Sequence, residues 1–472
     1  MALRNTHGGP ALKIVWTILI SCVLAANVPA EETVNGSQAE NEFFRGSHLL
    51  SQDKLSEALE ALEKAVRLDP DNAKYKQVFA VACNNFGLKS AGEGKVKDGV
   101  DALEKAVALA PEDADIRSNF VLAALQASAL PPEKMSTTDK IAVLRKALAI
   151  DPENARCRKA LAGQLNNFGV GRGRRGDFEE EAAHVKEAAD LEPGNGEIKA
   201  NLATAYYNLA LKKGKSGAVV EEVDILRKAG KLSPKDEMIR KRLAGALSDL
   251  AVVKGKEGDS KTQISLLRES LEIIPTDPIT KQNLAAALNN LAVSENGRMD
   301  TAERIAKLKD SLKLDPKNKA TVANLCNLLA REAVREAGNG SVAKAITMLK
   351  EALNLDPMNS VVKKNLGAVY HNEALKKGEQ GEHPAEIKLL KTALETDDSN
   401  AQIKSDLALA YNDYAVSLGK KGDDKKELNY LSKAAKLYPD HKVIQENLAR
   451  AKEKMSRKAK KNTKEKKDRT AG

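Results

Sequence analysis

Residues 196–236 read GEIKANLATAYYNLALKKGKSGAVVEEVDILRKAGKLSPKD, and the same pattern of residues recurs along most of the 472-residue chain. Its proline, Pro234, has counterparts at intervals of 41 residues, or 82 for the last, namely Pro70, Pro111, Pro152, Pro193, Pro275, Pro316, Pro357 and Pro439. Asp398 occupies the place where one proline is missing. Self-similarity at a fixed period predicts a repeat architecture in which each unit must stack on its neighbours.

Each unit has the pattern of two helices joined by a turn. In residues 196–236, Leu202, Ala203 and Tyr206 lie at i, i+1 and i+4, which is one face of a helix. Gly217 then breaks that helix. A second apolar-periodic stretch follows, and the proline prevents it from continuing. The sequence therefore predicts an all-α fold of helix–turn–helix repeats.

Residues 39–72 are the shortest unit, with 34 residues, and they carry Gly46, Ala58, Ala65 and Pro70. In length and in these residues the unit resembles the tetratricopeptide repeat family. The resemblance implies a right-handed superhelical solenoid whose first helices line the concave side. The longer units resemble the same repeat with seven residues added before the turn glycine, which we expect to lengthen the first helix by about a turn and to enlarge the loop.

The repeat boundaries divide the whole chain. We expect a signal peptide at 1–30, a short linker at 31–38 and ten repeats at 39–441, of which the first is 39–72 and nine have 41 residues. A capping helix at 442–457 and a basic disordered tail at 458–472 complete the prediction.

Two columns of the first helices are polar where a core would be apolar. Units are numbered here from position 1, so that Ala73 is position 1 of the second unit. Position 6 holds Asn119, Asn201, Asn283, Asn324, Asn365, Asp406 and Asn447, and position 13 holds Asn85, Asn167, Asn208, Asp249, Asn290, Asn372 and Asp413. Seven residues separate the columns, so both lie on one face of the helix, two turns apart.

This Asn-lined face is the candidate peptide-binding site. An asparagine side chain both donates and accepts, as an extended peptide backbone requires. The other interpretation is structural, with each Asn bonding adjacent turns or neighbouring repeats. If the face binds peptide, replacing Asn201, Asn283 and Asn365 with Ala should abolish capture and leave melting unchanged.

The N-terminus has the pattern of an export signal. Arg4 and Lys13 precede the apolar run 14–26, and small residues lead up to Ala30. Three outcomes stay open, namely cleavage after Ala30, an uncleaved anchor, and lipid attachment at Cys22, where 19–22 resemble a lipoprotein box. We expect a periplasmic or secreted protein, possessing glycosylation acceptors at Asn35 and Asn339 if the source is eukaryotic.

The charge lies mainly at the two ends. Of the formal charge of +10, residues 1–30 carry +2 and residues 451–472 carry +7, so the body carries only +1. A nearly neutral body argues against a nucleic-acid surface. The mean hydropathy of −0.43 excludes a polytopic membrane protein. The tail could dock on an anionic surface, and an envelope scaffold anchored by this tail or by lipidated Cys22 is the alternative function.

We expect no enzyme, no cofactor, no catalytic residue and no metal site. The glycines at 171, 173 and 176 fit a dinucleotide fingerprint but follow no strand. The six histidines show no metal-ligand spacing. Cys83, Cys157 and Cys326 fall in non-neighbouring repeats, too far apart for the ~7 Å limit of a disulfide. The function we expect is a scaffold that binds a protein or peptide on its Asn-lined face.

Overall fold

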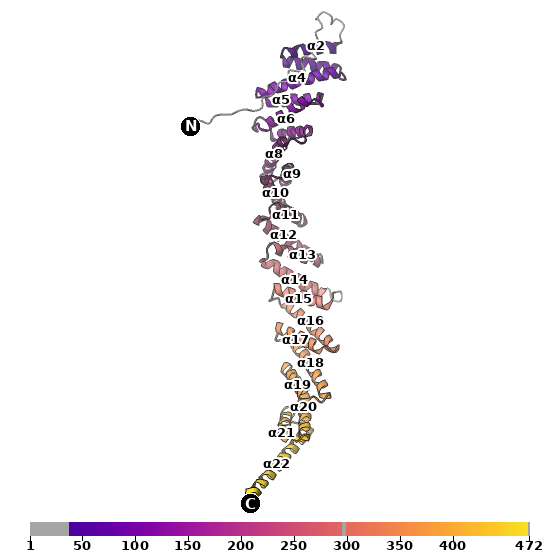
Figure 1. The fold of residues 1–472 in the computed structure, drawn as a ribbon, viewed down its shortest axis with the longest axis vertical. Helices are drawn as coiled ribbons and strands as arrows, with labels where there is room; N and C mark the ends of the chain where they lie inside the picture. The colour runs from indigo at the N-terminus through magenta and orange to yellow at the C-terminus, as the bar shows by residue number, and fades with distance from the viewer. Residues whose placement is uncertain (1–36, 295–298, 471–472) are drawn as a thin grey trace, which may run out of the picture. The chain divides into compact units, whose positions relative to one another are not determined.

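The computed structural model describes residues 37–294 and 299–470, which form an all-α helical repeat solenoid. First and second helices of the repeats alternate along the chain (Figure 1), and most pack on their neighbours in sequence, as α10 does on α9 and α11. The first helices are α2 (Gln38–Ser51), α4 (Ala73–Gly92), α6 (Ala114–Ser128), α8 (Ala155–Gly173), α10 (Gly196–Lys215), α12 (Glu237–Lys256), α14 (Pro278–Ser294), α16 (Lys319–Gly338), α18 (Ser360–Glu379) and α20 (Ala401–Lys420). The second helices are α3 (Leu55–Leu68), α5 (Val96–Leu109), α7 (Thr137–Ile150), α9 (Phe178–Leu191), α11 (Val219–Leu232), α13 (Ser260–Ile273), α15 (Thr301–Leu314), α17 (Val342–Leu355), α19 (His383–Thr396) and α21 (Asp424–Leu437). The last helix is α22 (Lys442–Thr470).

The turn after each second helix is built by the residues around the repeated proline. Two residues after it stands an Asn or Asp that caps the next first helix, because its side-chain oxygen accepts from the free backbone N–H groups there; before α22, His441 takes this place and accepts through its Nδ1. Asn195, for example, accepts from the N–H groups of Glu197 and Ile198. The same residue that marks the end of a unit in the sequence therefore starts the next helix.

The turn inside most of the repeats contains a residue in a left-handed backbone conformation, whereas the turn of the third repeat, at 129–136, has none. The seven turn glycines have φ between 71° and 89°, a region that a side chain disfavours. In the shortest unit Asp53 takes this place with φ 61°. The turns stay short in the longer units, because α4 has 20 residues where α2 has 14. Six of the seven added residues thus extend the helix, by more than the single turn we expected.

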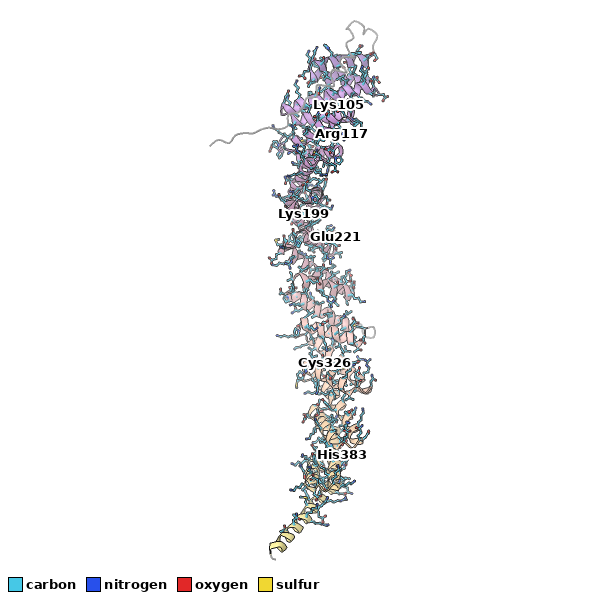
Figure 2. The ribbon with its side chains drawn as sticks, viewed as in Figure 1. Lys105, Arg117, Lys199, Glu221, Cys326 and His383 are labelled. Carbon is cyan, nitrogen blue, oxygen red and sulfur yellow. The ribbon has the colours of Figure 1, made fainter. Side chains whose placement is uncertain are left out.

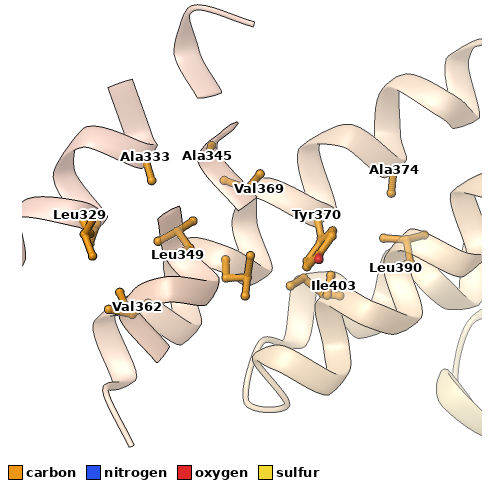
Figure 3. Packing of buried hydrophobic residues seen from close by; sticks show 14 of the residues in the cluster. Leu329, Ala333, Ala345, Leu349, Val362, Val369, Tyr370, Ala374, Leu390 and Ile403 are labelled. Atoms are coloured by element: carbon orange, nitrogen blue, oxygen red, sulfur yellow. The ribbon is translucent and has the colours of Figure 1, made fainter. Parts of the chain in front are cut away.

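The chain divides into two compact units, of which the first ends at Ala246 and the second begins at Leu247. Each has an apolar core that runs from repeat to repeat. In the second unit this core joins α16 to α20, with Leu349, Val362, Tyr370 and Leu390 packed together (Figure 3). One helical pair cannot bury its own apolar faces, so stacking supplies most of the stabilising contacts.

Two helices depart from the repeat pattern. The first helix α6 ends at Ser128, five residues shorter than α4, because Pro131 and Pro132 follow and cannot extend a helix. The last helix, α22, continues to Thr470. Residues 458–470, expected to be a disordered tail, are therefore helical, and the cap does not end at residue 457. A run of Lys, Glu and Ala has high helix propensity, which outweighs the repulsion between its like charges.

Candidate functional site

The asparagines at position 6 are half-buried, and four of the six bond to the preceding repeat. Asn119 donates its Nδ2 to the Oδ1 of Asn84 at 2.9 Å, and Asn201 donates to Asn166 at 3.0 Å. The same contact joins Asn324 to Asn289 and Asn447 to Asn412, both at 2.9 Å. In each pair the acceptor lies 35 residues earlier, at position 12 of the previous first helix.

Position 12 therefore links the two columns. Asn84, Asn166, Asn289 and Asn412 are buried, with 6 to 9% of each exposed. Each also donates to its neighbour at position 13, over distances of 3.0 to 3.4 Å. Positions 6, 12 and 13 thus form short hydrogen-bonded chains across the repeat interface, which we call relays. This is the structural interpretation that the sequence left open.

The sequence reasoning missed position 12. Its column reads Asn84, Leu125, Asn166, Tyr207, Ser248, Asn289, Ala330, His371 and Asn412, which is too mixed to stand out. The signal was the spacing of 35 residues between each of these and position 6 of the next unit. At one step the pair changes chemistry, since His371 lies 2.7 Å from Asp406.

The other predicted residues are placed as follows. Asn283 and Asn365 are half-buried, and neither side chain has a hydrogen bond within the described residues. Asn208 donates to Glu181 at 3.4 Å, and burial raises the pKa of that carboxyl. At position 13, Asn85 is half-buried, while Asn167, Asp249, Asn290, Asn372 and Asp413 are exposed. The exposed column at position 13 is therefore better placed for a ligand than position 6.

An apolar row lies beside this column in the compact unit that begins at Leu247. At position 16, three residues further along each first helix, are Val252, Val293, Val334 and Leu375, each between 40 and 51% exposed. Residues three apart are neighbours on a helix surface. Four consecutive repeats thus expose a large apolar side chain next to position 13, and we call these four residues the apolar row.

The same helix face is apolar at its start. Position 2 holds Ile279 and Val361, which are 65 and 57% exposed. Between positions 2 and 16 lies position 9, where Ala286 and Ala368 are small and exposed. Aligned apolar side chains of this kind are unusual on a surface that faces only water, and they mark an interaction site.

The remaining predicted features are placed as follows. Asn339 ends α16 at an exposed turn, whereas Cys22, Asn35 and the signal lie outside the described residues. In the described part of the chain no three His, Cys, Asp or Glu side chains are grouped to hold a metal ion. No described helix is long and apolar enough to cross a membrane. Cys83, Cys157 and Cys326 are buried and free.

Comparison with known proteins identifies the shortest repeat. The tetratricopeptide repeat family model matches residues 43–72. No curated protein matches the chain. Among solved structures, the TPR domain of P58(IPK) is 17% identical, with 89% of this chain and 99% of that chain covered and a TM-score of 0.22.

Two further structures are similar at the same level. A human IFIT1 dimer with m7Gppp-AAAA is 17% identical over 88% of this chain and 89% of that chain, with a TM-score of 0.19. YrrB, described as a TPR protein with an unusual peptide-binding site, is 18% identical over 46% of this chain and 95% of that chain, with a TM-score of 0.20. These superpositions are poor, so no functional residue is carried over from them.

Proposed function

We propose that the chain is a tetratricopeptide repeat scaffold for protein–protein interaction, as the family model over residues 43–72 supports, and that it binds an extended peptide segment of a partner along its first helices. The apolar row of Val252, Val293, Val334 and Leu375 carries the proposal. Side chains from a bound peptide would cover these residues. Burying one exposed valine or leucine contributes up to about 1.5–3 kcal/mol.

The exposed column at position 13 would supply the polar contacts. Asn290 and Asn372 lie beside Val293 and Leu375 on the same helices. Asn372 has no side-chain partner within the described residues, so both its donor and its acceptor are free. Such groups can bond to peptide backbone whatever the peptide sequence, while the apolar row selects its side chains. Position 6 would support the surface from behind rather than touch the ligand.

A selection from a random peptide library tests this function. Peptides that the wild-type protein enriches should bind the double variant Val293→Glu/Val334→Glu at least about tenfold more weakly, since two apolar contacts become charged. Val220→Glu is the matched control, because Val220 is 55% exposed but lies on a second helix, α11. Equal binding to the double variant and the wild type would disprove the role of this surface.

The place of action is proposed from the N-terminal sequence. We propose that residues 1–30 direct export, with cleavage after Ala30. N-terminal sequencing of the protein purified from its host distinguishes cleavage, an acylated Cys22 and an intact anchor. A protein that starts at Met1 and stays in the cytoplasm would disprove export.

A further inference from the structure

In the compact unit that ends at Ala246, a cavity of about 320 Å³ lies between α6, the end of α7 and the start of α8. Val121, Leu122 and Leu125 of α6 line it together with Ile150, at the end of α7. Leu125 and Ile150 also pack against the buried core of this region. The apolar wall is therefore held in place by the fold, and a ligand would not have to order it.

The cavity lies at a repeat step where the relay is replaced by apolar residues. At the other steps between the 41-residue units at least one of the residues at position 12 and at position 6 of the next unit is polar, whereas here they are Leu125 and Ala160. No polar group at these two positions would be left without a bond when an apolar side chain enters. Burial of such a side chain at this step thus avoids the desolvation cost it would have elsewhere.

The rim of the cavity is positively charged. Two of its three charged side chains are Arg117 and Arg156, and the third is Asp151. Asp151 already accepts from Asn154 at 3.0 Å. Figure 2 labels the place of Arg117 in the chain. Its Nη2 donates to the carbonyl of Ile150 at 2.9 Å, and the guanidinium keeps further N–H donors.

Arg156 is exposed and has no partner within the described residues. It stands in the first turn of α8, where no acidic residue is present. Lys159, three residues further on, is exposed on the same side. A helix N-terminus already favours negative charge, so this cluster of cations is complementary to an anion at the rim.

We propose that this cavity is an anchor pocket for a peptide in which a large apolar side chain is followed by an acidic residue. The apolar side chain fills the space between α6 and α7, and the carboxylate pairs with Arg156 and Arg117. This inference rests on the proposed peptide-binding function and adds a sequence preference to it. A buried apolar anchor with a charged neighbour at the rim is the usual source of specificity in peptide recognition.

Methyl NMR titration of the full chain with two synthetic peptides tests the pocket. The probes are acetyl-Ser-Phe-Asp-Ser-amide and the same peptide with Lys in place of Asp. The Asp peptide should shift the methyl signals of Val121, Leu122 and Leu125 in a saturable way, and the Lys peptide should bind at least about tenfold more weakly. No saturable shift, or equal binding of both peptides, would overturn the proposal.

Two variants localise the binding. Ser118 is exposed at the cavity wall, so Ser118→Trp should fill the pocket and weaken the Asp peptide about tenfold or more. Ala200→Trp is the matched control, because Ala200 is exposed at the same position of α10. Arg156→Glu removes no contact that the fold uses, and it should reverse the preference between the two peptides. Unchanged binding by Ser118→Trp would refute the pocket.

The outcome separates this inference from the proposed function. Library peptides whose binding depends on Val293 and Val334 report only on the compact unit that begins at Leu247. If they bind while the Asp peptide does not shift the methyl signals of Leu122 and Leu125, only the pocket is disproved. If they bind equally well to the double variant, the proposed function fails by its own test.

Discussion

The bond between Asn166 and Asn201 can be exchanged for an apolar pair that the chain already uses. We consider Asn166→Leu, Asn201→Ala and the double variant, which copies Leu125 and Ala160 from the preceding step. Asn166 is only 6% exposed, and its Oδ1 accepts from Asn201 at 3.0 Å. Either single change leaves a polar group without its partner at the interface between α8 and α10.

The expected magnitudes follow from that geometry. Leaving a buried polar group unsatisfied costs about 1–3 kcal/mol, whereas replacing both partners with apolar groups can be nearly neutral. Each single variant should therefore be about 1–3 kcal/mol less stable at this interface, and the double variant should lie within about 1 kcal/mol of the wild type. The coupling between the two residues should be clearly non-additive.

Hydrogen exchange measured by mass spectrometry is the suitable assay, because repeat arrays open locally and a single midpoint does not describe them. Amides of α8 and α10 should exchange roughly 5- to 150-fold faster in the single variants. Exchange in α2 and α3, several repeats away, serves as the internal control. A double variant as unstable as the sum of both singles would refute the reasoning, as would an unaffected Asn166→Leu.

The result also bears on the expectation drawn from the sequence for Asn201, Asn283 and Asn365. Alanine at these places was expected to leave melting unchanged. The bond from Asn201 to Asn166 contradicts this for Asn201. Only Asn283 and Asn365, which have no side-chain partner in the described part of the chain, retain that expectation.

Three further predictions concern the described core. Burial raises the pKa of the Cys83 thiol to about 12, so a thiol reagent at pH 8 should label it only after unfolding in urea, and fast labelling of the native protein would contradict this. Burial also raises the pKa of Glu181. The native state then holds its proton more tightly than the unfolded state, so this residue's contribution to stability falls as pH rises from the ordinary Glu value through the raised one. Glu181→Gln should flatten that dependence and raise the urea midpoint at pH 7, and an unchanged pH profile would count against it. A Cβ added at Gly169 would lie 2.7 Å from Val185 Cγ2, whereas at Gly171 it meets nothing within 4 Å. Gly169→Ala should cost about 1–3 kcal/mol and Gly171→Ala should gain about 0.5–1 kcal/mol, as urea unfolding of the two variants can show.

Much of the fold was predictable because its determinants act over a few residues. The proline of each unit, the Asn or Asp two residues later and the turn glycine all work within one turn of chain. Asn195, Gly217 and Pro234 thus have the roles that their positions in residues 196–236 indicate. The lengths of α6 and α22 were not predicted, since the first depends on two consecutive prolines and the second on a charged run that we took to be disordered.

The candidate site was predicted only in part, because its residues act across repeats. Asn201 has a visible place in a column, yet its partner Asn166 stands 35 residues away in a column that looked irregular. The exposure of Val334 could not be read either, because a valine can lie on the buried or on the exposed side of an amphipathic helix.

The amino-acid sequence by itself determined the repeat, its two helices and the turns between them. Those features depend on backbone preferences, caps and hydrophobic periodicity, which are local in the chain. The tertiary structure decided which asparagines are bonded between repeats, which valines stay exposed, and where a cavity opens between α6 and α7. Those outcomes depend on which side chains meet when one repeat stacks on the next, and a single unit carries no information on its neighbour.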